Sequence, residues 1–293
     1  KVFVQLYNEG LIYKDNRLIK WDPKLLTAIS DLEVENKSEK SKMWYIKYFT
    51  KDKKNSVIVA TTRPETMLGD TAVAVHPQDK RYSDLVGKTL ILPLVNREIP
   101  VIADEYSDPD KGSGAVKITP GHDFNDFEVG RRHNLEIINI FDENACIVDK
   151  KFAKNYMGLD RFEARKKVIE DLEKEKLIVK IEEVENVLPY GDRSGVIIEP
   201  WLMEQWYVNA KELSKPTIQA VEDGKMKFIP KNWENLFFEW MHNIQPWCIS
   251  RQLWWGHRIP VWYGPDKKIF VELDEETAIK KACLLYTSDA ADD

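Results

Sequence analysis

Five polar side chains lie within ten residues of one another in the stretch GSGAVKITPGHDFNDFEVGRRH, residues 112–133. They are a cation, a hydroxyl, an imidazole and two carboxylates: Lys117, Thr119, His122, Asp123 and Asp126. Asp123 and Asp126 are three residues apart, a spacing that places both on one face of a helix. Carboxylates can bind an ammonium group, and a lysine with a threonine can bind a hydroxyl, so the cluster suits a small zwitterion. The alternative interpretation is a helix N-terminus whose dipole favours acidic residues.

The residues around this cluster predict the elements that would position it. Ala115 to Ile118 form a short apolar run, which is typical of a buried strand. The turn-forming sequence Thr119-Pro120-Gly121 follows it. Either Asp123 or Asn125 can cap a helix that begins after this turn. We therefore expect a strand, a tight turn and a helix, with the five polar side chains at their junction.

A second stretch, VIVATTRPETMLGD at residues 57–70, has a similar organisation. Val57 to Thr62 are rich in β-branched residues and predict a strand. Pro64 ends that strand, and Glu65-Thr66 can begin a helical turn. The alternating sequence TAVAVH, residues 71–76, then predicts another strand.

Together, TTRPET…GDTAVAVHP and GSGAVKITPGHDFNDFEVGRRH closely resemble the editing domain of the valyl-tRNA synthetase family. This domain is an insertion in the class I synthetases for valine, isoleucine and leucine, and the resemblance extends over residues 1–282. The leucine enzymes usually have an Asp where Glu65 stands and lack the Lys-Ile-Thr run. The isoleucine enzymes usually differ around Arg63. The valine family is therefore favoured, with an isoleucyl or leucyl editing domain as the alternative.

The resemblance implies a fold class and a division of the chain. The fold is α+β, with a β-barrel-like editing domain inserted in a split Rossmann-type catalytic domain, of which only flanking pieces are present. Residues 1–31 correspond to the end of the first catalytic half, residues 32–200 to the editing domain with its connecting strands, and residues 201–282 to the return into the second half. Residues 283–293 do not match, and we interpret them as a non-native tail.

Other segments add expectations about the elements of this domain. Two strand-like sequences, LEVE and MWYIKYF, flank a charged stretch at residues 36–42 and predict a hairpin within residues 32–49. Further short strands are expected at residues 90–93, 99–103, 136–140 and 178–187, and a helix at 160–176 with Asp160 and Glu163 at its start. Many short strands punctuated by Pro and Gly favour a compact barrel-like domain.

By motif position, the resemblance also implies roles for individual residues. Lys117 and Thr119 would recognise the hydroxyl of threonine by hydrogen bonding. Asp126 is the first candidate for binding the α-ammonium, and Asp123 is the second, although Asp123 can instead cap the helix. Thr61, Thr62 and Arg63 would line the pocket and approach the terminal adenosine. His122 is a candidate for orienting water, with a turn-stabilising role as the alternative, and Trp255 is a candidate for lining the aminoacylation pocket.

The implied chemistry is hydrolysis of an aminoacyl ester at the 3′ end of a tRNA. Threonine and valine are nearly isosteric, and an apolar pocket rejects an added hydroxyl poorly, so this family uses a second, hydrolytic site. Such a site discriminates when its own buried donors are left unpaired by the wrong ligand. The sequence contains no recognisable Ser-His-Asp or Cys-His arrangement. We therefore expect a positioned water, with orientation and electrostatics supplying most of the acceleration.

Composition limits the alternatives. The chain has 293 residues, a net charge of −6 and 43% hydrophobic residues. This charge argues against a wholesale basic nucleic-acid binder but allows a local basic patch. Cys146, Cys248 and Cys283 are too widely spaced for a zinc or disulfide framework, and Asp22 stands where some relatives carry a zinc-binding Cys, so we expect no metal. No apolar run is long enough to span a membrane, and a cytoplasmic monomer is the simplest expectation.

Two further expectations concern cofactors and partners. Editing would need no cofactor, whereas ATP and Mg²⁺ would serve only the parent ligase, whose HIGH-type and KMSKS-type motifs lie outside this chain. The expected partner is the acceptor end of tRNA(Val), with threonine or valine as the aminoacyl moiety. One alternative is a module that binds the tRNA 3′ end without activity in isolation. A nucleotide-binding enzyme of another class is disfavoured, because the sequence has no glycine-rich phosphate loop.

Overall fold

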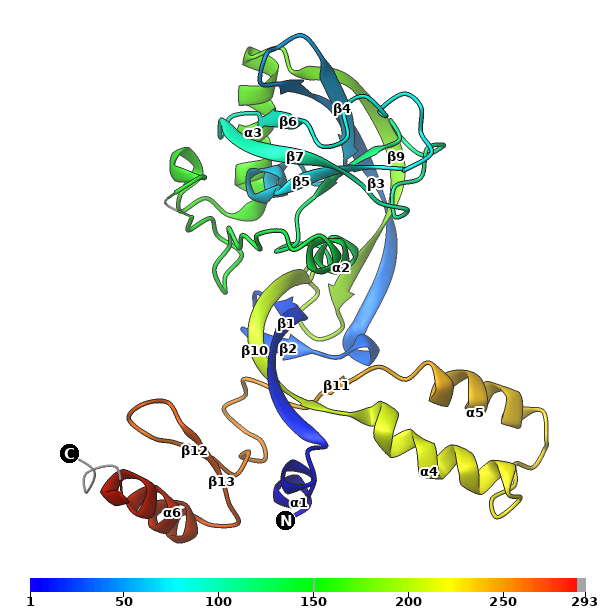
Figure 1. Ribbon diagram of the computed structural model, residues 1–293, viewed down its shortest axis with the longest axis vertical. Helices are drawn as coiled ribbons and strands as arrows, with labels where there is room; N and C mark the ends of the chain where they lie inside the picture. The colour runs from blue at the N-terminus through cyan, green and yellow to red at the C-terminus, as the bar shows by residue number, and fades with distance from the viewer. Residues whose placement is uncertain (150, 289–293) are drawn as a thin grey trace. The chain divides into compact units, whose positions relative to one another are not determined.

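The computed structural model describes residues 1–149 and 151–288. These form two compact units, which are described separately: residues 17–203, and residues 1–16 together with the chain from residue 204 onward. The chain passes from one unit to the other within β1 (Ile12–Asp22) and β10 (Glu199–Val208) (Figure 1). The divisions therefore fall at residues 16/17 and 203/204, whereas the sequence-based boundaries were 31/32 and 200/201. The assignment of the flanking pieces to a catalytic domain stays a prediction.

The larger unit is built on a strongly bent, mostly antiparallel sheet. Its strand order is β4-β3-β6-β7-β5-β8, with β9 paired to β3 outside this path. The strands are β3 (Val34–Thr50), β4 (Ser56–Thr61), β5 (Ala72–Val75), β6 (Thr89–Leu92), β7 (Arg97–Ala103), β8 (Ala115–Ile118) and β9 (Ile178–Gly191). The end strands β4 and β8 lie close to each other, so the sheet is a nearly closed barrel (Figure 1). The expectation of a barrel-like unit with mixed helices and strands is confirmed.

Strand β3 corrects the prediction of a hairpin within residues 32–49. It is one strand of 17 residues, and its first part pairs with β9, from Val34 opposite Gly191 to Ile46 opposite Ile178. Its last part pairs with β4, from Trp44 opposite Thr61 to Phe49 opposite Ser56. The charged residues 36–42 resemble a turn because they are exposed on a two-stranded ribbon. Their partner strand lies about 140 residues away in the sequence, beyond the reach of local pattern analysis.

The barrel interior is the main hydrophobic core. Alternate residues of β3, including Ile46 and Tyr48, are fully buried there with residues of β4 to β7. Helix α3 (Arg161–Lys174) contributes Ala164, Val168 and Leu172 to this core. As predicted, the Asp160 carboxylate caps this helix by accepting a hydrogen bond from the Phe162 N–H.

Helix α2 (Phe124–Arg132) packs through Val129 in a second apolar cluster with β5 and β8, where Ala72, Ala74 and Ile118 are buried. The Asp123 side chain caps it by accepting hydrogen bonds from the N–H groups of Asn125 and Asp126. Residues 136–140, predicted as a strand, are irregular instead. Their apolar character reflects burial, because Ile138 and Ile140 belong to the barrel core. The unit also contains β2 (Thr27–Ile29) and the 3₁₀ turns η1 (Asp31–Glu33), η2 (Pro64–Gly69) and η3 (Lys154–Tyr156).

The smaller unit has its own apolar cluster, formed by Val4, Ile12, Trp206, Val208 and Val271. Its remaining elements are α1 (Val2–Asn8), α4 (Ala210–Glu222), α5 (Trp233–His242), α6 (Glu275–Ser288), β11 (Trp247–Cys248), β12 (Val261–Tyr263) and β13 (Ile269–Val271). Residues 283–288 of the predicted tail are the end of α6, and residues 289–293 lie outside the described part. None of the described helices is long and apolar enough to cross a membrane.

Candidate functional site

The first part of the site is a buried polar cluster on β8 and η2. Lys117 and Thr119 are two residues apart, so their side chains leave the extended backbone on the same side. The Lys117 ammonium donates hydrogen bonds to the Thr66 hydroxyl at 3.1 Å, to Asp70 Oδ1 at 3.3 Å and to the Thr119 hydroxyl. The Thr119 hydroxyl in turn donates to Asp70 Oδ1 at 2.6 Å, and the Tyr48 hydroxyl donates to Asp70 Oδ2 at 2.8 Å.

These contacts satisfy almost every polar atom in the cluster. An ammonium group has three N–H donors, and the three contacts of Lys117 use all of them. Asp70 has no exposed surface, and the side chain of Lys117 is 10% exposed. Burial raises the pKa of Asp70, and the Lys117 charge with the Thr119 and Tyr48 hydroxyls opposes that rise. The cluster is therefore a preformed, self-satisfied network with one partly accessible cation.

Asp126 lies at the edge of this network, on the first turn of α2. Its Oδ2 accepts a hydrogen bond from the Thr119 backbone N–H at 2.9 Å, which ties the helix to the end of β8. Its other oxygen has no hydrogen bond to the described residues. Burial, together with the nearby charge of Asp123, raises the pKa of Asp126 to about 7, against an opposing effect of Lys117. Asp126 is thus a carboxylate with one unused acceptor and a marked preference for a positively charged partner.

Arg63 and two buried carboxylates form the second part of the site. The guanidinium donates to Glu65 Oε1 through Nε at 3.3 Å, to the carbonyl of His122 through Nη1 at 3.1 Å, and to Glu199 Oε1 through Nη2. Glu65 also accepts two hydrogen bonds from Arg165, at 2.7 and 2.8 Å. Burial would raise the pKa of Glu65, but its contacts with Arg165 and Arg63 outweigh burial and lower it. Glu65 is therefore an anion at neutral pH.

His122 lies between these two parts. Its side chain is fully buried, and Nε2 accepts a hydrogen bond from the Ile140 backbone N–H at 3.0 Å. The close approach of the neighbouring segments explains Gly121, because a Cβ there would lie 2.3 Å from the Ile138 carbonyl oxygen. Burial lowers the pKa of His122 well below its usual value, and the charges of Arg63 and Lys117 add to this effect. The buried neutral ring favours the turn-stabilising alternative over a water-orienting role.

The structure brings most of the predicted residues together in the larger unit. Hydrogen bonds connect Lys117, Thr119 and Asp126. Arg63 donates a hydrogen bond to the backbone carbonyl of His122. The Thr61 hydroxyl accepts a hydrogen bond from the Arg63 N–H at 3.0 Å, and Thr62 is partly exposed beside it. Trp255 lies in the smaller unit, where its side chain is 94% exposed.

Sequence reasoning assigned no role to two central carboxylates, Asp70 and Glu199. Asp70 stands in the GDTAVAVHP stretch, but a surface turn residue would give the same local pattern. Glu199 is 73 residues beyond Asp126 and begins β10, so only the tertiary fold places it beside Arg63. The available signal for Glu199 was a charged residue directly before the apolar run Pro-Trp-Leu-Met.

Comparison with known proteins complements this geometry. The family described as tRNA synthetases class I (I, L, M and V) matches residues 1–291. The chain belongs to the class I tRNA synthetases.

Curated relatives of this class I synthetase chain include valine–tRNA ligases from several bacteria. The ligase of Mesorhizobium japonicum is 56% identical over 98% of this chain and 33% of its own length. The ligase of Pelagibacter ubique is 56% identical over 99% of this chain and 33% of its own length. The chain therefore spans about a third of the length of these relatives.

A solved structure also matches the synthetase chain, but only distantly. It is the ternary complex LeuRS-tRNA-LeuAMS of Agrobacterium radiobacter K84, with 16% identity and a TM-score of 0.39 over 94% of this chain and 36% of that chain. This likeness is too low to carry an argument about the site.

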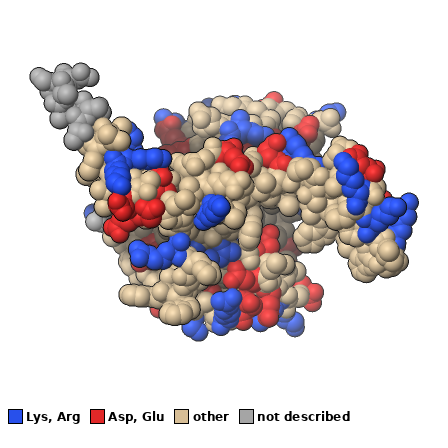
Figure 2. All heavy atoms as spheres, turned by 90° about the horizontal axis from the view of Figure 1, so that it is seen from below, with Lys and Arg blue, Asp and Glu red and all other residues tan. Residues whose placement is uncertain are grey.

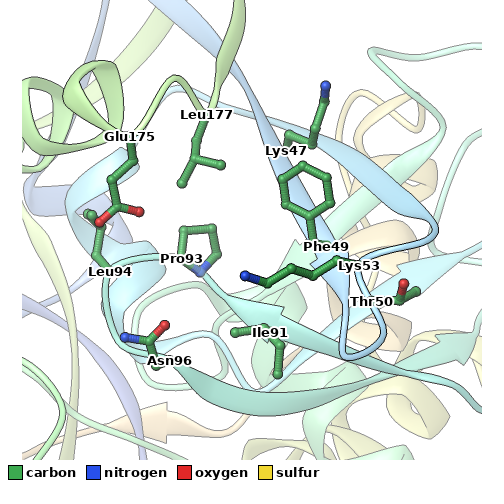
Figure 3. Close-up of a pocket in the computed structure, with 10 residues that line it drawn as sticks. All are labelled: Lys47, Phe49, Thr50, Lys53, Ile91, Pro93, Leu94, Asn96, Glu175 and Leu177. Carbon is green, nitrogen blue, oxygen red and sulfur yellow. The ribbon is translucent and has the colours of Figure 1, made fainter.

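A separate pocket in the larger unit of this synthetase shares no residue with the cluster. It has a volume of about 260 Å³ and an apolar floor that includes Phe49, Ile91 and Leu177, with Lys53 and Glu175 extending over it from opposite walls (Figure 3). It lies at the end of α3 and beside the turn that follows β6.

Proposed function

We propose that this chain hydrolyses threonyl-tRNA(Val), as the editing part of a valine–tRNA ligase. The observation that carries the proposal is the buried network of Lys117, Thr119 and Asp70 with Asp126 at its edge. It combines a hydroxyl-binding group with an ammonium-binding carboxylate. The identity of more than half to valine–tRNA ligases supports threonine as the amino acid to be rejected. The parent enzyme would attach valine to tRNA(Val) with ATP and Mg²⁺.

In this proposal, the unused oxygen of Asp126 accepts the α-ammonium of the aminoacyl group. The threonine hydroxyl replaces one of the three acceptors of Lys117, because contacts within the protein already use all three N–H groups. Valine has no hydroxyl to offer, so the same displacement would leave a buried N–H unpaired, at a cost of about 1–3 kcal/mol. This difference corresponds to roughly 5- to 150-fold discrimination.

The hydrolytic step needs a positioned water rather than a protein nucleophile. The water oxygen attacks the ester carbonyl carbon, the bond to the ribose oxygen breaks, and that oxygen leaves with a proton from the water. Arg63, with Thr61 and Thr62, would contact the terminal adenosine and hold the ester in place. Binding that orients the ester and the water supplies most of the acceleration, since proximity alone can contribute several kcal/mol.

The decisive experiment is deacylation of threonyl-tRNA(Val) by this chain, with valyl-tRNA(Val) as the control substrate. We expect selective hydrolysis of the threonyl ester, loss of activity in Asp126→Ala, and loss of selectivity in Lys117→Ala. Asp149→Ala is a matched control, because Asp149 also accepts backbone hydrogen bonds but lies outside the cluster. Equal hydrolysis of both esters by the native chain would contradict the proposal that Lys117 recognises the threonine hydroxyl.

The second candidate function is binding of the tRNA 3′ end without hydrolysis. The net charge of −6 favours it over a general nucleic-acid binder, because only local contacts could then hold the tRNA. Basic and acidic side chains are intermingled on the face shown in Figure 2, which agrees with local rather than extended basic contacts. A folded chain that binds tRNA(Val) but leaves threonyl-tRNA(Val) intact would favour this candidate.

A further inference from the structure

Glu199 joins two arginines at the base of the site. Its side chain is 3% exposed, Oε1 accepts a hydrogen bond from Arg63, and Oε2 accepts one from Arg161 Nη1 at 2.8 Å. Such charge-assisted contacts hold side chains in fixed orientations more firmly than neutral hydrogen bonds do. The position of the Arg63 guanidinium therefore depends directly on Glu199.

Arg63 retains unused donors after these contacts are formed. A guanidinium has five N–H groups, and the contacts with Glu65, His122 and Glu199 use three of them. The two remaining N–H groups are on the terminal nitrogens, and 30% of the side chain is exposed. Two donors in a rigid fork suit the oxygen atoms of a phosphate or a carbonyl group.

The charges of this network point to the same kind of ligand. The network contains three guanidinium groups, those of Arg63, Arg161 and Arg165, and two carboxylates, those of Glu65 and Glu199. One positive charge is therefore left over. Arg161 is almost fully buried, whereas the side chains of Arg63 and Arg165 are 30% and 25% exposed, so the surplus charge is accessible at both, and at Arg63 it coincides with two unused donors. This surplus positive charge favours a ligand that presents an electron-rich oxygen.

His122 faces Glu199 as well. Because the Ile140 N–H donates to Nε2, the neutral ring must carry its proton on Nδ1. Nδ1 is buried without a hydrogen bond, and it lies 3.9 Å from Glu199 Oε1. The Glu199 carboxylate is thus placed to attract the Nδ1–H of His122 while it holds Arg63.

We propose that Glu199 is a positioning residue of the hydrolytic site, which holds the two unused N–H groups of Arg63 toward an oxygen of the 3′-terminal nucleotide. This inference rests on the proposed function of the same site. Glu199 acts through Arg63 and His122 and does not touch the substrate itself. Glu199 connects β10 to the segment after β4, and the sequence motifs do not reveal this connection.

The test compares Glu199→Gln and Glu199→Ala with a matched control, Asp104→Asn. Asp104 is also a buried carboxylate, with 8% of its side chain exposed, and it accepts hydrogen bonds from Arg132 and contacts His133 away from the polar cluster. We expect kcat/KM for threonyl-tRNA(Val) to fall by about 10²-fold in Glu199→Ala, mainly through KM. Glu199→Gln keeps a hydrogen-bond acceptor, so its kcat/KM should fall only about tenfold. Asp104→Asn should leave kcat/KM unchanged.

A binding measurement keeps this inference separate from the proposed function. The probe is a non-hydrolysable 3′-threonylamido-adenosine, with and without a 5′-phosphate. Weaker binding to Glu199→Ala supports the inference, and dependence of the loss on the 5′-phosphate would identify phosphate, rather than a ribose or carbonyl oxygen, as the partner of Arg63. Absence of hydrolysis by the native chain would overturn only the proposed function. Unchanged binding and kcat/KM in folded Glu199→Ala, or an equal loss in Asp104→Asn, would overturn the inference.

Discussion

At the scale of single residues, the site is defined by carboxylates in contrasting environments. Glu65 is paired with two arginines and has a lowered pKa, whereas Asp126 is buried with one unpaired oxygen and has a pKa raised to about 7. Asp70 is enclosed by three donors and serves the network rather than a ligand. Of these groups, Asp126 has the strongest reason to bind a cation, because an ammonium would remove the cost of its buried charge.

This contrast predicts how pH affects the Asp126 side chain. Its pKa in the folded state is above the reference value of 3.8, so the native chain binds more protons than the unfolded chain between about pH 4 and 7. The contribution of Asp126 to stability therefore decreases as pH rises through this window. We expect Asp126→Asn to become progressively more stable than the native chain from pH 4 to 7, measured by thermal unfolding.

Activity should have the opposite dependence on pH, because only the ionised carboxylate binds an ammonium. Deacylation of threonyl-tRNA(Val) should increase as pH rises through about 7. The bound ammonium adds a positive charge that favours ionisation of Asp126, so the midpoint with substrate should be lower than without it. A stability difference between Asp126→Asn and the native chain that does not change with pH would contradict this account.

At the scale of elements, the junction between β8 and α2 determines where the site residues lie. The sequence predicts this junction well, because an apolar run, a Thr-Pro-Gly turn and an Asp cap are local signals. Asp160 caps α3 as predicted, and of the two candidates for α2, Asp123 and Asn125, it is Asp123 that forms the cap. The long strand β3 and the irregular residues 136–140 were not predictable, because pairing with β9 and burial in the core depend on distant segments. For the same reason, the roles of Asp70 and Glu199 emerge only from the fold.

The two helices that begin with an Asp cap, α2 and α3, offer a matched pair of variants. Asp123→Ala and Asp160→Ala each remove an N-cap, which should cost about 1 kcal/mol of stability in urea unfolding. Asp123→Ala should also reduce deacylation, because it loosens the turn that carries Asp126, whereas Asp160→Ala should not. Equal activity of the two variants would show that the cap of α2 does not position the site.

At the scale of the whole molecule, the candidate site lies entirely within residues 17–203. This unit contains the barrel core, the two helices capped by Asp123 and Asp160, and the charged partners of Arg63, Glu65 and Glu199. The smaller unit has a separate apolar cluster and contains Trp255, the candidate for the aminoacylation pocket. Two units with separate cores are expected to fold independently when few residues connect them.

We therefore predict that a shortened chain of residues 17–203 unfolds cooperatively and retains selective deacylation of threonyl-tRNA(Val). Circular dichroism during thermal unfolding would establish folding, and initial rates would establish activity relative to the 293-residue chain. A shortened chain that folds but binds tRNA(Val) poorly would show that the smaller unit supplies contacts to the tRNA. Failure of residues 17–203 to fold would contradict the independence of this unit.

The self-satisfied network around Lys117 has a consequence for turnover. Because the protein itself provides three acceptors for the Lys117 ammonium, a hydroxyl that enters gains only the difference between two similar hydrogen bonds. Free threonine, which has lost its attachment to the nucleotide, should therefore gain little affinity from its hydroxyl. The hydroxyl that selects threonyl-tRNA for hydrolysis then adds little to product inhibition, and only the ammonium contact with Asp126 holds the released amino acid.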